Sequence, residues 1–308
     1  MLKIRAGSRG SKLALWQTDL VIEKLSQLHP GVCFETVMIK TKGDKLLDVA
    51  LSRIGDKGLF TKEIESELLA GHIDLAVHSM KDLPTEVPDG LEIGAILTRE
   101  QPQDVLIAAN GASLAELPHG ARIGTSSLRR RAQLAAVRPD LRIVDLRGNI
   151  DTRIRRLTEE GLDAIILAFA GVARLGYEDR VTEMLPFLPA VGQGAIGIEI
   201  RKDDPTVKPL VQTINHDETR TAIAAERSFM AVLEGGCQIP IGALGTVKGD
   251  QLEVEGLVAD LDGKRILRDR MTGPAADPVG LGRKLAERLL DQGAGDILRE
   301  IRSQESNR

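Results

Sequence analysis

Short apolar runs alternate with longer amphipathic stretches from Lys3 to about Leu210, and this alternation constrains the fold more than any other feature of the chain. Residues 2–7 and 73–79 are runs of strand length, whereas residues 11–28 carry apolar side chains at helical spacing. Helices that alternate with strands connect neighbouring parallel strands across a sheet. The sequence therefore predicts an α/β architecture.

The first amphipathic stretch predicts a helix with a defined start. Ser11 precedes it and is a typical N-cap residue, because its hydroxyl can accept a hydrogen bond from the first helical turn. The apolar residues expected on its buried face are Leu13, Trp16, Leu20 and Leu28. A second helix is predicted over residues 61–71, which begin with Thr61 and end with Gly71.

Two segments far apart in the chain begin in the same way. Residues 4–16 read IRAGSRGSKLALW and residues 121–133 read ARIGTSSLRRRAQ. Each is a strand, then a glycine with small hydroxyl residues, then the start of a helix. Backbone N–H groups and the helix dipole make such a turn an anion site, and a nearby arginine strengthens it. We therefore expect two similar lobes that bind one anionic ligand.

A third region begins near Asp217 with a long predicted helix. After it, the segments ALGTVKG, QLEVEGLVADL and RILRDRM alternate across Gly-Asp and Asp-Gly turns. Such turns between strand-like runs predict an antiparallel meander. With a last helix from about Val279, the region is predicted to be a small α+β domain that has Cys237 at its entrance.

The composition sets broad limits. A chain of 308 residues is expected to hold two or three domains, and aromatic residues make up only 2% of it, so its cores must be aliphatic. No apolar run approaches the roughly 20 residues of a membrane span, and the start does not resemble a signal peptide, so we expect a cytoplasmic protein. Two cysteines cannot form a disulfide framework and the five histidines lack metal-ligand spacing, so no metal is expected.

The formal net charge of −4 hides a local excess of arginine between residues 122 and 156, where only Asp140, Asp145 and Asp151 oppose it. An acidic protein with such an arginine field is expected to bind an anion, with a solvated helix surface as the plain alternative. Nucleic acid is disfavoured as the partner, because aromatic residues are scarce and no nucleic-acid motif occurs.

The string GQGAIG at residues 192–197 fits a dinucleotide-binding pattern but lacks its context. That pattern needs a strand before it and a helix after it, whereas here prolines precede it and the strand-like AIGIEIR follows. A turn between lobes is the better interpretation. The string GSRGSK near the start lacks the spacing of a nucleotide-binding loop, and either an anion turn with Arg9 and Ser11 or a plain helix cap would account for it.

His78 and Ser79 are adjacent, so on a strand they point to opposite faces and cannot form a proton-relay dyad. Ser79, Lys81 and Asp82 nevertheless cluster where a strand ends before Pro84. The carboxyl ends of strands are where α/β proteins build their sites. A solvated Lys-Asp turn is the alternative to a binding site here.

Cys237 lies in the stretch LEGGCQIPIGA, and no histidine or acid stands beside it that would activate a thiolate. A buried cysteine that acts as a small apolar side chain is the common alternative. The preceding glycines and Pro240 favour an exposed, fixed loop with room around the sulfur. Such a loop suits a permanently attached group better than a nucleophile.

Five motifs in order, HSMKDLP, GTSSLRRRAQL, LRGNIDTR, VGQGAIGIE and LEGGCQIPIGA, closely resemble those of the porphobilinogen deaminases, also called hydroxymethylbilane synthases. The resemblance is collinear from residue 4 to the last domain, where it is strongest around the cysteine. It implies two periplasmic-binding-protein-like lobes plus a small α+β C-terminal domain with a three-stranded antiparallel sheet. The first lobe would be residues 1–98 and 194–214, the second residues 99–193, and the C-terminal domain residues 215–308. AIGIEIR would be the strand that returns to the first lobe.

The resemblance also implies an activity and a cofactor. In this family the cysteine of the GGCQ loop holds a dipyrromethane through a thioether, so Cys237 would be an anchor. Four porphobilinogen molecules are joined to it head to tail, each with loss of ammonia, and hydrolysis releases linear hydroxymethylbilane for tetrapyrrole and haem biosynthesis. The family further implies a cytoplasmic monomer with this small-molecule substrate, and with neither a nucleic acid nor a membrane as partner.

Residue by residue, the resemblance assigns roles to the matching positions. Asp82 would be catalytic, because a carboxylate stabilises the positive charge that ammonia loss puts on a pyrrole nitrogen. The residues expected to bind the cofactor are Ser79, Lys81, Asp82, Thr125, Ser127, Arg129, Arg130 and Arg147, with Cys237 as the covalent attachment. Those expected to bind substrate or the growing chain are Arg9, Ser11, Arg147, Arg153 and Arg174. Residues 52–60, with Lys57 and Phe60, resemble a lid over the cleft.

Two other functions fit part of the sequence. A non-catalytic, two-lobed protein that binds a small anion would explain the lobes and the arginines, but not Asp82 or Cys237. A hydrolase that uses Cys237 as its nucleophile predicts a sulfur that is rapidly alkylated.

Overall fold

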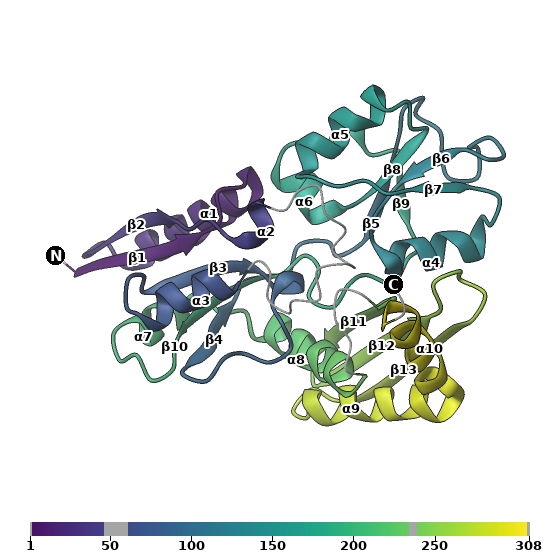
Figure 1. Ribbon diagram of the computed structural model, residues 1–308. Helices are drawn as coiled ribbons and strands as arrows, with labels where there is room; N and C mark the ends of the chain where they lie inside the picture. Colours follow the sequence, from purple (N-terminus) through teal and green to yellow (C-terminus); the bar gives the residue numbers. More distant parts are fainter. Residues whose placement is uncertain (1, 46–60, 234–238, 307–308) are drawn as a thin grey trace. The chain divides into compact units, whose positions relative to one another are not determined.

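The computed structural model describes residues 2–45, 61–233 and 239–306, which form two compact units (Figure 1). Unit 1 contains the described residues up to Glu100 together with Gly194–Arg220. Unit 2 contains Gln101–Gln193 and the described residues from Thr221 onward. The chain therefore passes from unit 1 to unit 2 and back before it enters its last region. The division into three domains at the predicted boundaries stays a prediction.

Unit 1 is built on a five-stranded sheet with the strand order β2-β1-β3-β10-β4. Its strands are β1 (Leu2–Ser8), β2 (Val32–Met38), β3 (Leu75–Ser79), β4 (Leu91–Ile96) and β10 (Ile196–Arg201). Its helices are α1 (Lys12–Leu28), α2 (Lys42–Lys45), α3 (Lys62–Leu69), the short 3-10 helix η2 (Met80–Asp82) and α7 (Val207–Gln212). Strand β1 pairs in parallel with β2 and β3, whereas β10 is antiparallel to β3 and β4. The predicted return strand is thus confirmed as β10.

Helix α1 begins as predicted but buries a different face. The Ser11 hydroxyl accepts a hydrogen bond from the backbone N–H of Ala14, at 3.3 Å. The buried residues of the helix are Gln17, Thr18, Val21 and Leu25, whereas Trp16 and Leu28 are exposed. The expected face was wrong at Trp16 and Leu28 but right at Leu20, which packs against the core. The buried face is shifted toward Gln17, whose side chain turns inward to hydrogen-bond with Ser79 at the end of β3.

Residues 101–193 of unit 2 form a second five-stranded sheet, in the order β7-β6-β8-β5-β9. Its strands are β5 (Asp104–Ala108), β6 (Arg122–Gly124), β7 (Arg142–Val144), β8 (Ala164–Ala168) and β9 (Glu183–Leu185). Its helices are α4 (Leu128–Val137), α5 (Ile150–Glu159), α6 (Phe169–Arg174) and the 3-10 helix η3 (Glu178–Arg180). As in unit 1, three parallel strands adjoin an antiparallel one, so the two sheets share one topology and confirm the predicted pair of similar lobes.

The last region of unit 2 contains the predicted three-stranded antiparallel sheet. Its strands are β11 (Ile241–Lys248), β12 (Gln251–Ala259) and β13 (Ile266–Pro274). Its helical segments are α8 (Asp217–Val232), which begins in unit 1 and enters unit 2 at Thr221, α9 (Pro278–Leu289), η4 (Leu290–Ala294) and α10 (Gly295–Ser306). Phe229 of α8 and Leu285 of α9 are fully buried, and both pack over Gly256 of β12. Phe229 thus supplies one of the few aromatic rings in a largely aliphatic core.

The string GQGAIG forms a turn followed by a strand, as its context predicts. Gly192 and Gly194 have φ angles of 74° and 90°, a left-handed conformation that favours glycine, and β10 begins at Ile196. The helix that a dinucleotide site would need does not follow. Among the described helices, none is both long enough and apolar enough to cross a membrane.

Gly197 of β10 lies directly beneath η2, so a methyl group at this position would collide with the Met80 side chain. We predict that Gly197→Ala lowers the free energy of unfolding by about 1–3 kcal/mol, because the buried Met80 side chain would have to repack to make room for the methyl group. Gly31→Ala is the control, since nothing lies within 4 Å of the added methyl group. Urea denaturation of both variants measures the difference, and equal stabilities would contradict this packing argument.

Candidate active site

The predicted site residues of unit 1 meet at one edge of its sheet. Because β1 and β3 are parallel neighbours, their carboxyl ends lie side by side. Arg9 and Ser11 follow β1, whereas Ser79 ends β3 and Lys81 and Asp82 belong to η2. The sheet therefore brings together two motifs that are about 70 residues apart in the sequence.

Ser79 is held in place by Gln17. The Gln17 amide nitrogen lies 2.9 Å from the Ser79 hydroxyl and its amide oxygen 3.2 Å from it. Ser11 caps helix α1, which is compatible with the anion turn predicted there because its second lone pair and the neighbouring N–H groups can still face a ligand.

His78 points to the opposite face of the sheet from Ser79, as the strand alternation predicts. Its Nε2 lies 3.0 Å from Oε2 of Glu199 on β10, and both side chains are buried. Glu65 of α3 lies close enough to interact electrostatically with both, and burial raises the pKa of its carboxyl. These groups form a polar core behind Ser79 and give no sign of a proton relay to it.

The predicted site residues of unit 2 also follow parallel strands. Thr125 follows β6, and Ser127 caps α4 by accepting a hydrogen bond from the Arg130 backbone N–H at 3.4 Å. The Thr125 hydroxyl accepts one from the Ser127 N–H at 3.3 Å. These hydroxyls surround the start of a helix, where backbone N–H groups favour an anion.

Arg147, Arg153 and Arg174 come from the neighbouring strand ends. Arg147 follows β7, Arg153 lies in α5 and donates from Nε to the Gly148 carbonyl at 2.7 Å, and Arg174 ends α6 after β8. Strands β7 and β8 flank β6 in parallel, so all three arginines belong to the same sheet edge as Thr125.

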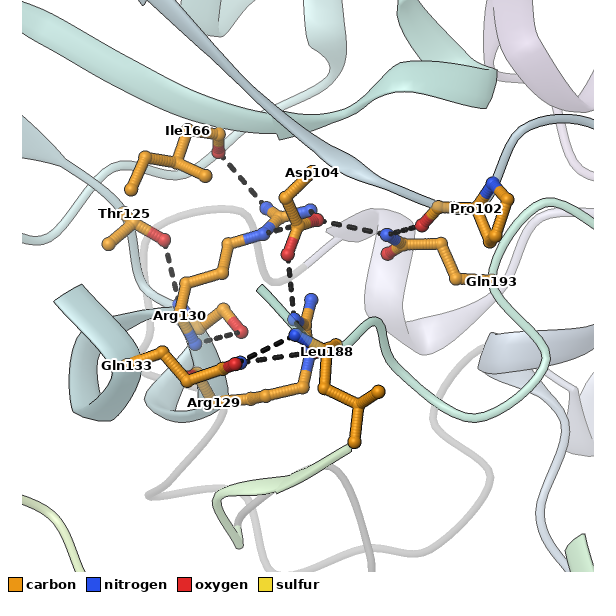
Figure 2. A network of polar contacts seen from close by, with 10 residues as sticks. Pro102, Asp104, Thr125, Arg129, Arg130, Gln133, Ile166, Leu188 and Gln193 are labelled. Carbon is orange, nitrogen blue, oxygen red and sulfur yellow. Dashed lines mark hydrogen bonds and ion pairs between the residues drawn. The ribbon is translucent and has the colours of Figure 1, made fainter. Parts of the chain in front are cut away.

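Arg129 and Arg130 extend instead into the interior, where both bind the carboxylate of Asp104 (Figure 2). Arg129 Nη1 lies 2.6 Å from Asp104 Oδ2, and Arg130 donates from Nε and Nη2 to Oδ1 at 3.0 and 2.8 Å. Arg129 also donates to the Leu188 carbonyl and Arg130 to the Ile166 carbonyl. Asp104 is fully buried, so this is an internal ion-pair network.

The network holds more positive than negative charge. Burial by itself would raise the pKa of Asp104, but the charges and hydrogen bonds of Arg129 and Arg130 outweigh it and hold that pKa well below its usual range. Burial also lowers the pKa of the Arg129 guanidinium. Two guanidinium groups and one carboxylate leave one net positive charge, and among the described residues Asp104 is the one carboxylate that hydrogen-bonds with either arginine.

Other members of the arginine field serve local structure. Arg138 pairs with Asp140 at 2.8 Å, and Arg155 pairs with Glu159 along the surface of α5. Arg122 donates to the carbonyls of Glu160 and Gly161 at the opposite, amino end of β6. The field is therefore not one site, and the sequence could not show this because it does not give the direction of each side chain.

Sequence reasoning missed Asp104, Gln193 and Glu199. Asp104 begins the buried run DVLIA, and Glu199 stands inside the apolar strand IGIEIR. A charged residue within an apolar strand requires a buried partner, so this signal was present. The partners of such a residue come from distant parts of the chain and cannot be identified from spacing.

Cys237, Lys57 and Phe60 lie outside the residues that the structure describes. The described residues contain no group of three or more His, Cys, Asp or Glu that could hold a metal ion.

Fold and site together define an α/β protein with two sheets of like topology, each with arginine and hydroxyl side chains at the carboxyl ends of its parallel strands, and an added α+β region. Residues 4–209 match the family model described as porphobilinogen deaminase, dipyromethane cofactor binding domain, and residues 220–291 match that of the porphobilinogen deaminase C-terminal domain. The chain belongs to the porphobilinogen deaminase family.

Individual relatives agree over nearly the whole chain. The porphobilinogen deaminase of Pelotomaculum thermopropionicum is 56% identical over 306 residues, 98% of each chain. That of Carboxydothermus hydrogenoformans is 58% identical over 303 residues, 97% of each chain. Among solved structures, an ancestral cationic amino acid solute binding protein is 17% identical with a TM-score of 0.44, over 68% of this chain and 87% of that one.

Asp104→Asn should reveal the charge network in the pH dependence of stability. The pKa of Asp104 is lower in the folded protein than in the unfolded chain, where it is about 3.9. Its carboxylate therefore stabilises the fold fully above that pH, and this stabilisation decreases progressively as the pH falls from there toward the lower folded pKa. We predict a loss of about 3–5 kcal/mol at neutral pH, because the substitution leaves buried guanidinium charge uncompensated.

Urea denaturation at about pH 7, 5 and 3.5 measures this loss, which should stay constant between the first two values and shrink at the third. Asp262→Asn is the control, because that carboxylate is 71% exposed and its loss should change stability by less than about 0.5 kcal/mol. A loss that already shrinks between about pH 7 and 5 would contradict the depressed pKa of Asp104.

Proposed function

We propose that this chain carries out the reaction of its family with Asp82 as the catalytic carboxylate and Cys237 as the covalent anchor. The chain is a transferase that joins four porphobilinogen molecules head to tail onto a dipyrromethane, with loss of ammonia at each addition, and releases linear hydroxymethylbilane by hydrolysis. The match of residues 4–209 to a model of the cofactor-binding domain is the observation that carries this function. The rest of the proposal assigns the individual residues.

The position of Asp82 at the end of β3 supports a catalytic role for its carboxylate. Ammonia loss from porphobilinogen leaves positive charge on the pyrrole nitrogen, and a carboxylate beside it lowers the energy of that state. Asp82 is partly exposed at the end of β3, next to Ser79 and Lys81. A carboxylate there can accept a hydrogen bond from the pyrrole N–H of this cation while the acceptor pyrrole forms the new C–C bond, and can then accept the proton that leaves the α-carbon of the acceptor ring.

The unit 2 residues fit the acidic side chains of pyrroles. Each pyrrole of the substrate carries an acetate and a propionate, so a bound chain presents many carboxylates. The buried Arg129–Arg130–Asp104 network has one net positive charge, which a ligand carboxylate would neutralise. Thr125 and Ser127 add hydroxyl groups at the start of α4. When bound, the dipyrromethane supplies the free pyrrole end to which the first substrate molecule is joined.

The remaining arginines of that sheet edge suit the incoming substrate and the growing chain. Arg147, Arg153 and Arg174 share the edge formed by β6, β7 and β8. In unit 1, Arg9 and Ser11 border Ser79 in the same way. We extend the proposal to a monomer that works in the cytoplasm and to the three-domain division given above.

Removal of the Asp82 carboxylate should nearly abolish turnover while leaving the fold intact. Asp82 is partly exposed, so Asp82→Ala should change stability by less than about 0.5 kcal/mol, whereas loss of general acid–base catalysis typically costs about 10²- to 10⁴-fold in rate. Asp89→Ala, at an exposed position in the following loop, is the matched control. Porphobilinogen consumption by the purified variants measures the effect, and a variant with most of its activity would refute the role.

Substitution of Cys237 should remove the covalent cofactor. Intact mass of the denatured protein should exceed the mass of the sequence by a two-pyrrole unit in the unaltered chain and in Cys33→Ser, whose cysteine is exposed on β2. Cys237→Ser should show the mass of the bare chain. If the unaltered chain is bare even after incubation with porphobilinogen, the anchor is refuted, and a rapidly alkylated sulfur at Cys237 would favour the hydrolase instead.

A further inference from the structure

Asp104 and Gln193 lie on the two segments by which the chain enters and leaves the first part of unit 2. Asp104 begins β5, three residues after the unit starts at Gln101, and Gln193 is the last residue before the chain returns to unit 1. The Gln193 amide donates to the Pro102 carbonyl at 2.6 Å and to Asp104 Oδ1 at 2.9 Å (Figure 2). One buried side chain thus ties the two segments to each other and to the arginine network.

Asp104 also brings together two side chains that the helix would separate. Consecutive residues of an α-helix point about 100° apart, so Arg129 and Arg130 cannot meet through helix geometry alone. Their guanidinium groups nevertheless converge on one carboxylate, which accepts hydrogen bonds from both arginines and from Gln193 (Figure 2). The carbonyls of Leu188 and Ile166 fix one further N–H of each arginine. Both side chains are therefore held in a single orientation.

We propose that Asp104 is a positioning residue for the reaction of this chain. It acts through Arg129 and Arg130, because its carboxylate holds both guanidinium groups in one orientation. Gln193 assists by holding Asp104 in place through a hydrogen bond. This inference rests on the proposed function, in which the two arginines hold cofactor carboxylates. Without Asp104, two like charges repel each other in a buried space, so the arginines lose their common orientation and the acceptor end of the cofactor is misplaced.

The test compares three variants of the full chain. Asp104→Asn removes the shared charge, and Gln193→Met removes the link to the two chain segments but leaves both ion pairs. Asp74→Asn is the matched control, because Asp74 also binds two arginines, Arg5 and Arg201, at 2.9 and 3.4 Å. It precedes β3, at the amino end of the strand, and so lies away from the edge that holds Ser79 and Asp82.

Steady-state kinetics should separate positioning from plain stability. With rates divided by the amount of folded, cofactor-loaded protein, Asp104→Asn should lower kcat about 100-fold, because a displacement of about 1 Å can cost that much. The KM for porphobilinogen should change by less than about threefold, since other residues bind the incoming substrate. Gln193→Met should lower kcat by a smaller factor, and Asp74→Asn should leave both constants within about twofold of the unaltered chain.

A second readout does not depend on activity. Hydrogen–deuterium exchange of cofactor-free protein should become faster in residues 101–104 and 128–131 and around Gln193 in the Asp104→Asn and Gln193→Met variants, and should stay unchanged there in Asp74→Asn. Local opening of these segments is what loss of their shared hydrogen bonds predicts.

The outcomes distinguish this inference from the proposed function. If the unaltered chain neither carries a two-pyrrole mass nor consumes porphobilinogen, the proposed function fails, and with it the positioning role. The unaltered chain could be active while the Asp104→Asn variant, folded and loaded with cofactor, keeps the normal kcat or changes only in KM. That result would overturn the positioning role alone. Should Asp104→Asn fail to fold, Gln193→Met decides: a lower kcat with faster exchange supports the role, and a normal kcat overturns it.

Discussion

The buried carboxylate of Asp104 is the interaction on which the organisation of unit 2 depends. It lies at the start of β5, an internal strand of the sheet, and accepts three hydrogen bonds from two consecutive arginines of one helix and a fourth from Gln193. A buried charge is expensive unless it is paired and hydrogen-bonded, and here each oxygen of the carboxylate has at least one donor. The pairing fixes α4 against β5 and leaves one net positive charge for a ligand to neutralise.

Unit 1 also contains a carboxylate that binds two arginines, and it lies at the amino end of β3. Asp74, just before β3, pairs with Arg5 of β1 and Arg201 of β10, so one carboxylate joins three adjacent strands at 2.9 and 3.4 Å. This arrangement leaves the carboxyl ends of β1 and β3 for Ser79, Lys81, Asp82 and Arg9. In unit 1 the structural ion pairs and the candidate site residues lie at opposite ends of the same strands, whereas in unit 2 Arg129 and Arg130 belong to both groups, so arginine content alone did not locate the site.

The parallel arrangement of strands accounts for the position of each candidate residue. Parallel strands place all their carboxyl ends at one edge, so short motifs that end successive strands become neighbours. The antiparallel return strand β10 then adds a small residue, Gly197, beneath the turn that carries Asp82. A two-lobed binding protein would share these edges but would have no need for Asp82 or a cysteine loop, so family membership and the position of Asp82 together favour the enzyme.

The sequence by itself determined the α/β class, the two similar lobes, the return strand and the antiparallel sheet of the last region. These features follow from local periodicity, turn residues and caps such as Ser11 and Ser127, whose effects act within a few residues. Its motifs also identified the family. The tertiary structure alone decided that Arg129 and Arg130 point inward to Asp104, that Gln193 joins them, that His78 pairs with Glu199 and that α1 buries Gln17. Each of these contacts joins residues from different elements, and spacing along a chain carries no information about which distant side chains will meet.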